Sequence, residues 1–225
     1  MMRPVVDYRQ FRFSKLNTPE FSHLKLLGGW IVYFILYFLT ENLIPAERCH
    51  VVHSALDDAI PFLEGFAVAY CFWFLLIAIT LVYFLLYDVD SFRRVQVFII
   101  ITQLGAMLVY IIWPSVQDLR PAVFPRDNFL THVMAFIYAF DTPTGVCPSL
   151  HVAYSIGMAS CWCKCKKAPV WWKVFVVAAA VVISAATAFV KQHSVIDIAA
   201  AIPLSALAEV LTFHVIYRKK KEKAS

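Results

Sequence analysis

Residues 65–87 read GFAVAYCFWFLLIAITLVYFLLY and contain no charged side chain. A helix of about 20 predominantly apolar residues is long enough to cross the hydrocarbon core of a bilayer. This stretch therefore predicts a membrane-spanning helix. The composition agrees, because hydrophobic residues make up 61% of the 225 residues and charged residues only 16%, whereas soluble domains have about 45–50% and about 25%. The sequence predicts an integral membrane protein.

The same composition excludes two other classes. A disordered chain is excluded because this one has too much apolar surface to remain unfolded in water. The net charge of +5 lies in short clusters between apolar runs. Since no basic stripe alternates with exposed aromatic residues, a nucleic-acid partner is not expected.

Five further stretches resemble the first in length and hydropathy. We predict an all-α, polytopic membrane protein with six spanning helices, at residues 26–43, 65–87, 95–116, 142–163, 174–190 and 194–217. Residues 128–140 are apolar but too short to cross, so we predict an interfacial or re-entrant helix in the loop between the third and fourth spans.

The basic residues predict the orientation and the division of the chain. If both termini are cytoplasmic, sixteen of the 20 Lys and Arg residues lie on the cytoplasmic side, as the positive-inside rule requires. We therefore predict a cytoplasmic N-terminal segment at residues 1–25, a six-helix membrane domain at 26–217 and a basic cytoplasmic tail at 218–225. The four remaining basic residues are extracytoplasmic: Arg48, Arg120, Arg126 and Lys191.

Three short polar segments fall at the extracytoplasmic ends of the predicted helices. They are DLRP at 118–121, CPSLH at 147–151 and KQHSVID at 191–197. Because this topology places them at one depth on one side of the membrane, we expect them to form one site. A charge at a membrane boundary usually has a function.

The cationic and hydroxyl groups of these segments suit a phosphate ester. The guanidinium of Arg120 can make paired hydrogen bonds to phosphate oxygens, and Lys191 adds a second positive charge. Ser149 follows a proline at the predicted start of a helix, where free N–H groups attract anions. We predict that Arg120, Ser149 and Lys191 bind phosphate.

The remaining polar residues suit nucleophilic and acid–base chemistry. His193 and Asp197 are four residues apart, so on a helix they share a face. The carboxylate can then hold one ring nitrogen and leave the other as a nucleophile. His151 would stand opposite, as the acid that protonates the leaving oxygen. This chemistry needs no metal ion and no cofactor.

The three segments resemble the motifs of the type-2 phosphatidic acid phosphatase superfamily of membrane lipid phosphatases. Its pattern is K-x6-R-P, then P-S-G-H, then S-R-x5-H-x3-D. Arg120-Pro121 is similar to the end of the first motif, residues 148–151 to the second, and His193 with Asp197 to the end of the third. The resemblance implies a phosphohistidine on His193, an orienting role for Asp197 and a general acid at His151. It also implies six helices, an extracytoplasmic site and a lipid phosphate substrate.

The chain departs from this pattern at four positions. Trp113 stands in place of the first lysine, Leu150 in place of the glycine, and Ala186 and Thr187 in place of Ser-Arg. Such losses are similar to those of a divergent branch that includes inositol phosphorylceramide synthases, as is the segment LDDAIPF at 56–62.

Three functions therefore stay open at this point. The first is hydrolysis of a lipid phosphate such as phosphatidic acid or a polyprenyl phosphate. The second is lipid phosphotransfer of the inositol phosphorylceramide synthase type, in which a lipid alcohol replaces water. The third is a non-enzymatic six-helix membrane protein. The sequence leaves open the oligomeric state and whether Cys49 pairs with Cys147.

Overall fold

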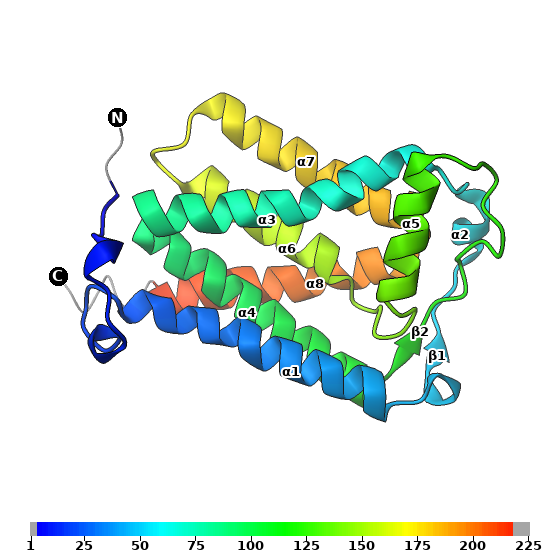
Figure 1. The fold of residues 1–225 in the computed structure, drawn as a ribbon, viewed down its shortest axis with the longest axis horizontal. Coiled ribbons are helices and arrows are strands. Elements are labelled where there is room, and N and C mark those ends of the chain that lie inside the picture. The colour runs from blue at the N-terminus through cyan, green and yellow to red at the C-terminus, as the bar shows by residue number, and fades with distance from the viewer. Residues whose placement is uncertain (1–3, 218–225) are drawn as a thin grey trace.

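The computed structural model describes residues 4–217, which fold into a bundle of helices lying side by side (Figure 1). The α-helices are α1 (Gly28–Leu43), α2 (Ala55–Ala59), α3 (Ala67–Tyr87), α4 (Val89–Ile112), α5 (Phe129–Phe140), α6 (Leu150–Lys164), α7 (Val170–Phe189) and α8 (Val195–Glu209), which continues as the π-helix η6 (Val210–Ile216). The short 3₁₀ helices are η1 (Tyr8–Gln10), η2 (Phe13–Lys15), η3 (Ser22–Leu27), η4 (Ala46–Arg48) and η5 (Glu64–Phe66), and the strands are β1 (His50–Val51) and β2 (Ser115–Val116). The predicted tail at 218–225 lies outside the described residues.

The described residues contain five helical segments that are long and apolar enough to cross a membrane. They are Ser22–Leu43, Glu64–Tyr87, Val89–Ile112, Val170–Phe189 and Val195–Ile216. Each overlaps one of the predicted spans, although α4 begins six residues earlier than predicted and ends before β2. An all-α membrane-embedded architecture is therefore confirmed. The remaining predicted span corresponds to α6, which has only 15 residues.

Polar side chains mark where several of these helices begin. The carboxylate of Asp88 accepts a hydrogen bond from the Ser91 N–H, at 3.2 Å, and separates α3 from α4. Ser149 and Ser194 cap α6 and α8 in the same way. Such caps satisfy N–H groups that have no partner within the helix, so short polar segments set the boundaries between long apolar ones.

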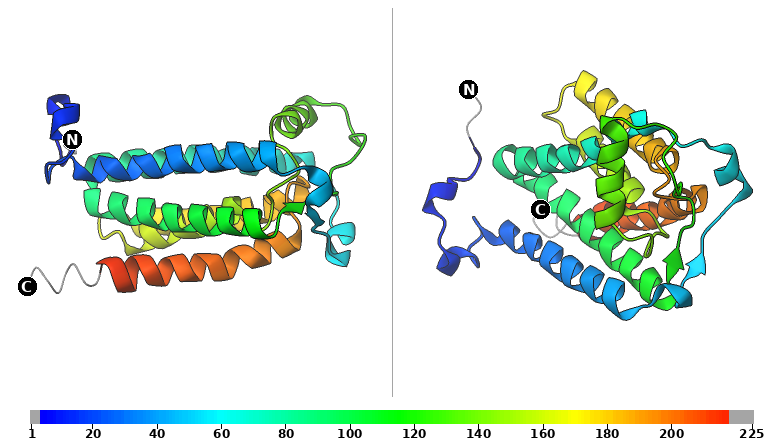
Figure 2. Two further views of the ribbon diagram at one scale, coloured as in Figure 1. Left: turned by 90° about the horizontal axis from the view of Figure 1, so that it is seen from below. Right: turned by 45° about the vertical axis from the view of Figure 1, so that its right-hand side comes forward.

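Helix α6 lies in the centre of the bundle. It packs against α4, α7 and α8, and α1 and α3 form an outer layer on the side opposite α8 (Figure 2). Most of its residues are buried, including Tyr154, Met158 and Trp162. The neighbouring helices therefore shield α6, although it is shorter than they are.

The outward faces of the surrounding helices are apolar. Large exposed hydrophobic side chains occur along the length of α1, α3 and α7, for example Ile31, Phe38, Val68, Val82, Val174 and Val181. Soluble monomers rarely expose contiguous apolar surface of this extent. These faces are suited to contact with lipid.

Helix α5 and the two strands lie at the end of the bundle away from the first and last described residues (Figure 1). The strands pair in parallel, with His50 opposite Ser115 and Val51 opposite Val116. This pairing joins the segment after α1 to the segment after α4. Helix α5 matches the short helix predicted at 128–140 and runs across the end of the bundle. Cys49 and Cys147 are both free thiols.

The contact between α6 and α4 leads to a prediction about stability. A Cβ atom added at Gly157 would lie 2.4 Å from Cδ1 of Phe98, whose ring is fully buried. Gly157→Ala is expected to lower stability by about 1–3 kcal/mol through overpacking, measured as the thermal unfolding midpoint in detergent. Gly28→Ala is the matched control, because a Cβ there meets no atom within 4 Å. Equal midpoints for the two variants would contradict this packing.

Candidate active site

Two histidines from different helices meet at the α5 end of the bundle. His193 precedes Ser194, the cap of α8, and His151 lies in the first turn of α6. Nε2 of His193 is 3.4 Å from Nδ1 of His151, and Nδ1 of His193 is 3.2 Å from Oδ2 of Asp197. The structure thus brings together the three residues for which the sequence predicts catalytic roles.

Asp197 is held in place by the first turn of α8. Its Oδ2 also accepts a hydrogen bond from the backbone N–H of Ser194, at 3.0 Å, and its side chain is fully buried. When His193 donates its Nδ1 proton to this carboxylate, Nε2 carries the lone pair. The nitrogen that faces His151 is therefore the one available as a nucleophile.

The ring of His151 is fixed by two aromatic side chains of α3. Its centroid is 4.6 Å from that of Tyr70 and 4.1 Å from that of Trp73. Its Nε2 is buried and has no hydrogen-bond partner among the described residues. Buried polar atoms nearly always have a partner, so this atom is a candidate to exchange a proton with a bound ligand.

Arg120 is held by acceptors of the protein. Its Nε and Nη2 atoms donate to Oε1 of Gln192, at 3.1 and 2.7 Å, and Nη1 donates to the carbonyl of Tyr138 at 3.1 Å. Burial lowers the pKa of its guanidinium from the ordinary value, while the nearby carboxylate of Asp141 acts in the opposite direction. Arg120 is thus hydrogen-bonded to Gln192, the residue that precedes His193.

Ser149 and Lys191 also have protein partners. The N–H of Ser149 donates to the carbonyl of Asp197, at 3.1 Å, and its hydroxyl caps the N–H of Val152. Lys191 has a positive φ of 54°, and its Nζ donates to the carbonyl of Asp57 at 2.7 Å. Both residues therefore join elements around the histidines, and phosphate binding would require Lys191 to exchange its partner.

Asp57 is a site residue to which the sequence reasoning assigned no role. It is 2% exposed and lies in α2. Its carboxylate accepts from the hydroxyl of Ser194 at 2.6 Å, from the N–H of Val195 at 2.9 Å and from the N–H of Ser54 at 2.8 Å. It fills the N-terminal end of α8, where the helix dipole favours negative charge. In the sequence, only its place in the LDDAIPF segment at 56–62 pointed to Asp57.

A second polar network lies beside the histidines. Nε2 of Gln192 donates to the hydroxyl of Tyr70 and to Oδ2 of Asp141, both at 3.3 Å, and the hydroxyl of Tyr37 donates to Oδ1 of Asp141 at 3.1 Å. These contacts join α1, α3 and the segments flanking α6 and α8. Single polar residues at unrelated positions gave no sequence signal for this network.

Asp118 of the predicted DLRP segment binds a histidine at the surface. His53 lies between Asp118, 2.8 Å from its Nδ1, and Asp58, 3.0 Å from its Nε2. These two hydrogen bonds raise the pKa of His53. These hydrogen bonds connect α2 to the segment after β2. The cluster is separate from the pair formed by His151 and His193.

His151 and His193 both line a cavity of about 540 Å³. Its other walls are mostly aromatic and come from α1, α3, α5 and α6. In the described part of the chain, no three His, Cys, Asp or Glu side chains are close enough to hold a metal ion. The polar side chains of the lining are those of the two histidines, Gln192, Asp141, Thr142 and Thr144, together with several tyrosines and tryptophans.

No known protein family, curated protein or solved structure matches this chain.

Proposed function

We propose that this chain is a membrane-embedded lipid phosphate phosphatase of the type-2 phosphatidic acid phosphatase superfamily. One observation carries the proposal: His193 lies between Asp197 and His151, at the end of an apolar cavity. Asp197 is the orienting carboxylate, His193 the nucleophile and His151 the general acid in this arrangement, which is the order that the motifs imply. Binding of a phosphate ester between the two histidines requires their rings to move apart, because Nε2 of His193 and Nδ1 of His151 are 3.4 Å from each other.

The reaction proceeds in two steps. Nε2 of His193 attacks phosphorus, the bond to the ester oxygen breaks, and protonated His151 gives its proton to that oxygen. Water then attacks the phosphohistidine while neutral His151 takes a proton from it, releasing phosphate and restoring His193. Asp197 keeps the proton on Nδ1 and stabilises the positive charge that forms on the ring.

The phosphate charge is balanced by groups around the histidines. Arg120 supplies a positive charge behind Gln192, and Lys191 can exchange the Asp57 carbonyl for a phosphate oxygen. The first N–H groups of α6 have no partner within their helix and attract anions. Preorganised positive groups of this kind stabilise phosphoryl transfer.

The proposal includes six spans, with both termini cytoplasmic and the histidines on the extracytoplasmic side. Helix α6, the fourth span along the chain, completes the six, and its central position supports this assignment. Helix α5 is an interfacial helix, supported by its apolar sequence and its course across the bundle end (Figure 1). The orientation is supported by the distribution of Lys and Arg.

Transfer to a lipid alcohol is a second candidate function. It is favoured by the mostly apolar lining of the cavity, which would admit an alcohol carrying an alkyl chain. Both reactions share the phosphohistidine and differ in the acceptor that attacks it.

The test is phosphate release by detergent-purified protein without added metal. Phosphatidic acid, lysophosphatidic acid and a polyprenyl phosphate are the substrates, and labelled phosphate is trapped on the protein in alkali, in which phosphohistidine is stable. We expect release from at least one lipid and a trapped label on His193. Phosphate release without any label would contradict the covalent route. Absence of both release and transfer to added lipid alcohol would refute the enzymatic proposal.

A further inference from the structure

We propose that the cavity below the histidines is a channel for a single alkyl chain, which reaches it from the bilayer between α1 and α3. This inference rests on the proposed function, because it assigns the chain to the phosphate ester that His193 attacks. It adds the path of the substrate, the number of chains bound and the residues that limit chain length.

One wall of the cavity is an aromatic stripe on α1. Trp30, Tyr33, Phe34 and Tyr37 all line it, at positions i, i+3, i+4 and i+7 of one helix face. From Tyr37 to Trp30 the stripe extends seven residues, about 10 Å along the helix. The cavity is therefore elongated along the bundle.

The facing wall is a matching stripe on α3. Tyr70, Trp73, Phe74 and Ile77 have the same spacing and also line the cavity. Tyr70 and Trp73 contact the ring of His151, so this stripe begins at the reactive end. Ile77 lies seven residues further along α3, at the far end of the same wall.

The far end of the cavity is closed by side chains that contact one another. Nε1 of Trp30 donates to Oε1 of Gln96 at 3.0 Å, and the ring of Trp30 meets that of Tyr154 edge to face. The imidazole, carboxylate and amide groups of the lining, from His151, His193, Asp141 and Gln192, lie at the opposite end. A ligand that is polar at one end and apolar at the other fits this distribution.

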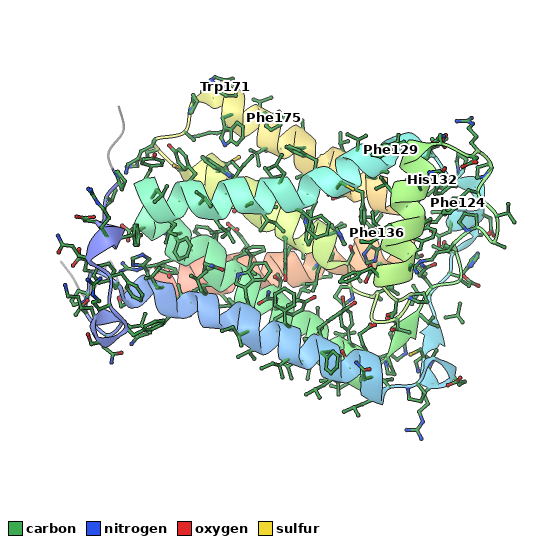
Figure 3. All side chains as sticks on the ribbon, viewed as in Figure 1. Phe124, Phe129, His132, Phe136, Trp171 and Phe175 are labelled. Atoms are coloured by element: carbon green, nitrogen blue, oxygen red, sulfur yellow. The ribbon has the colours of Figure 1, made fainter. Side chains whose placement is uncertain are left out.

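The cavity is open sideways at the apolar face of the bundle. Phe34 of α1 is 58% exposed and Phe74 of α3 is 57% exposed, and both also line the cavity. Phe136 of α5 extends over the gap between α1 and α3 (Figure 3) and is 71% exposed. The opening is therefore bordered by aromatic side chains that suit lipid, and a chain can enter without passing through water.

The chemistry of the walls selects an alkyl chain. Among residues 4–217, no Lys or Arg lines the cavity, so a second anionic group would find no counter-charge from these residues there. Each methylene buried on aromatic walls adds favourable free energy of binding. A volume of about 540 Å³ is typical of pockets for one small ligand, so a second chain would stay in the bilayer.

The first test compares kcat/KM for butyl, octyl and dodecyl phosphate. We expect kcat/KM of the unmodified protein to rise at least about tenfold from butyl to dodecyl phosphate, because buried methylenes add binding energy. In Ile77→Trp, which fills the far end, we expect the dodecyl to butyl ratio to fall about tenfold. Val82→Trp is the control, since Val82 lies on α3 but faces outward. An unchanged ratio in Ile77→Trp, or an equal fall in Val82→Trp, would overturn the inference.

The second test does not depend on turnover. A dodecyl phosphate with a photoreactive diazirine at its chain end is cross-linked to the full-length protein in detergent. Adducts on α1 and α3 should disappear with excess unlabelled dodecyl phosphate, while any adducts on the outward face of α7 should persist. Adducts suppressed by competitor without phosphate release would support the channel and refute the phosphatase. Phosphate release without suppressible adducts would refute the channel and leave the phosphatase standing.

Discussion

Replacing His193 with alanine is expected to lower the rate of phosphate release by at least about a thousandfold, because the variant has no nucleophile to accept the phosphoryl group. The rate is measured with detergent-purified protein and the best lipid phosphate. Asp197→Asn should lower it less, since the ring stays in place but its Nδ1 proton is no longer held by a charge. Adding Asp197→Asn to His193→Ala should cause no further loss, because the two residues act as one unit.

The matched control for this prediction is His132→Ala. His132 lies on α5, far more exposed than His193, and pairs with the exposed carboxylate of Asp127. Its replacement should leave the rate within about twofold of that of the unmodified protein. Retention of more than a tenth of the rate by a folded His193→Ala variant would exclude His193 as the nucleophile.

Replacing Asp57 with alanine is expected to produce the largest loss of stability, about 3–5 kcal/mol, because each buried donor left without its acceptor costs about 1–3 kcal/mol. The variant leaves the hydroxyl of Ser194 and the N–H groups of Val195 and Ser54 without their acceptor. Because these groups begin α8 directly after His193, the rate of phosphate release should fall as well. The unfolding midpoint in detergent and the rate at a temperature well below it give the two values.

The adjacent residue supplies the control. Asp58 has an exposed side chain and pairs with His53 at the surface, so Asp58→Ala should cost less than about 1 kcal/mol. Asp57→Asn keeps one carbonyl oxygen as an acceptor, so its loss of stability should lie between those of Asp57→Ala and Asp58→Ala. If Asp57→Ala and Asp58→Ala unfolded at the same temperature, the position of Asp57 at the start of α8 would not contribute to stability.

The prediction of the helices succeeded where the signal was local. Long, predominantly apolar stretches predicted α1, α3, α4, α7 and α8 with η6, because a helix that crosses a bilayer must be apolar along most of its length. The predicted span at 142–163 was placed too early. Its first eight residues form the loop before α6, in which Gly145 has a positive φ, and the actual helix begins only after the cap at Ser149.

The partners of the individual cations within the protein could not be predicted from residue type. Arg120 was predicted to bind phosphate because its guanidinium suits phosphate oxygens. In the fold its donors meet Gln192 and the carbonyl of Tyr138. Which acceptor a cation meets depends on the loops that pack around it, and neither charge nor spacing encodes those contacts.

The sequence by itself determined the membrane class, the positions of five long helices and the pairing of His193 with Asp197. Each of these depends on residues close together in the chain, through helix periodicity or a run of apolar side chains. The tertiary structure alone decided that His151 faces His193, that Asp57 holds the start of α8 and that aromatic stripes of α1 and α3 enclose a cavity. These contacts join residues far apart in the chain, so they exist only once the helices have packed around α6.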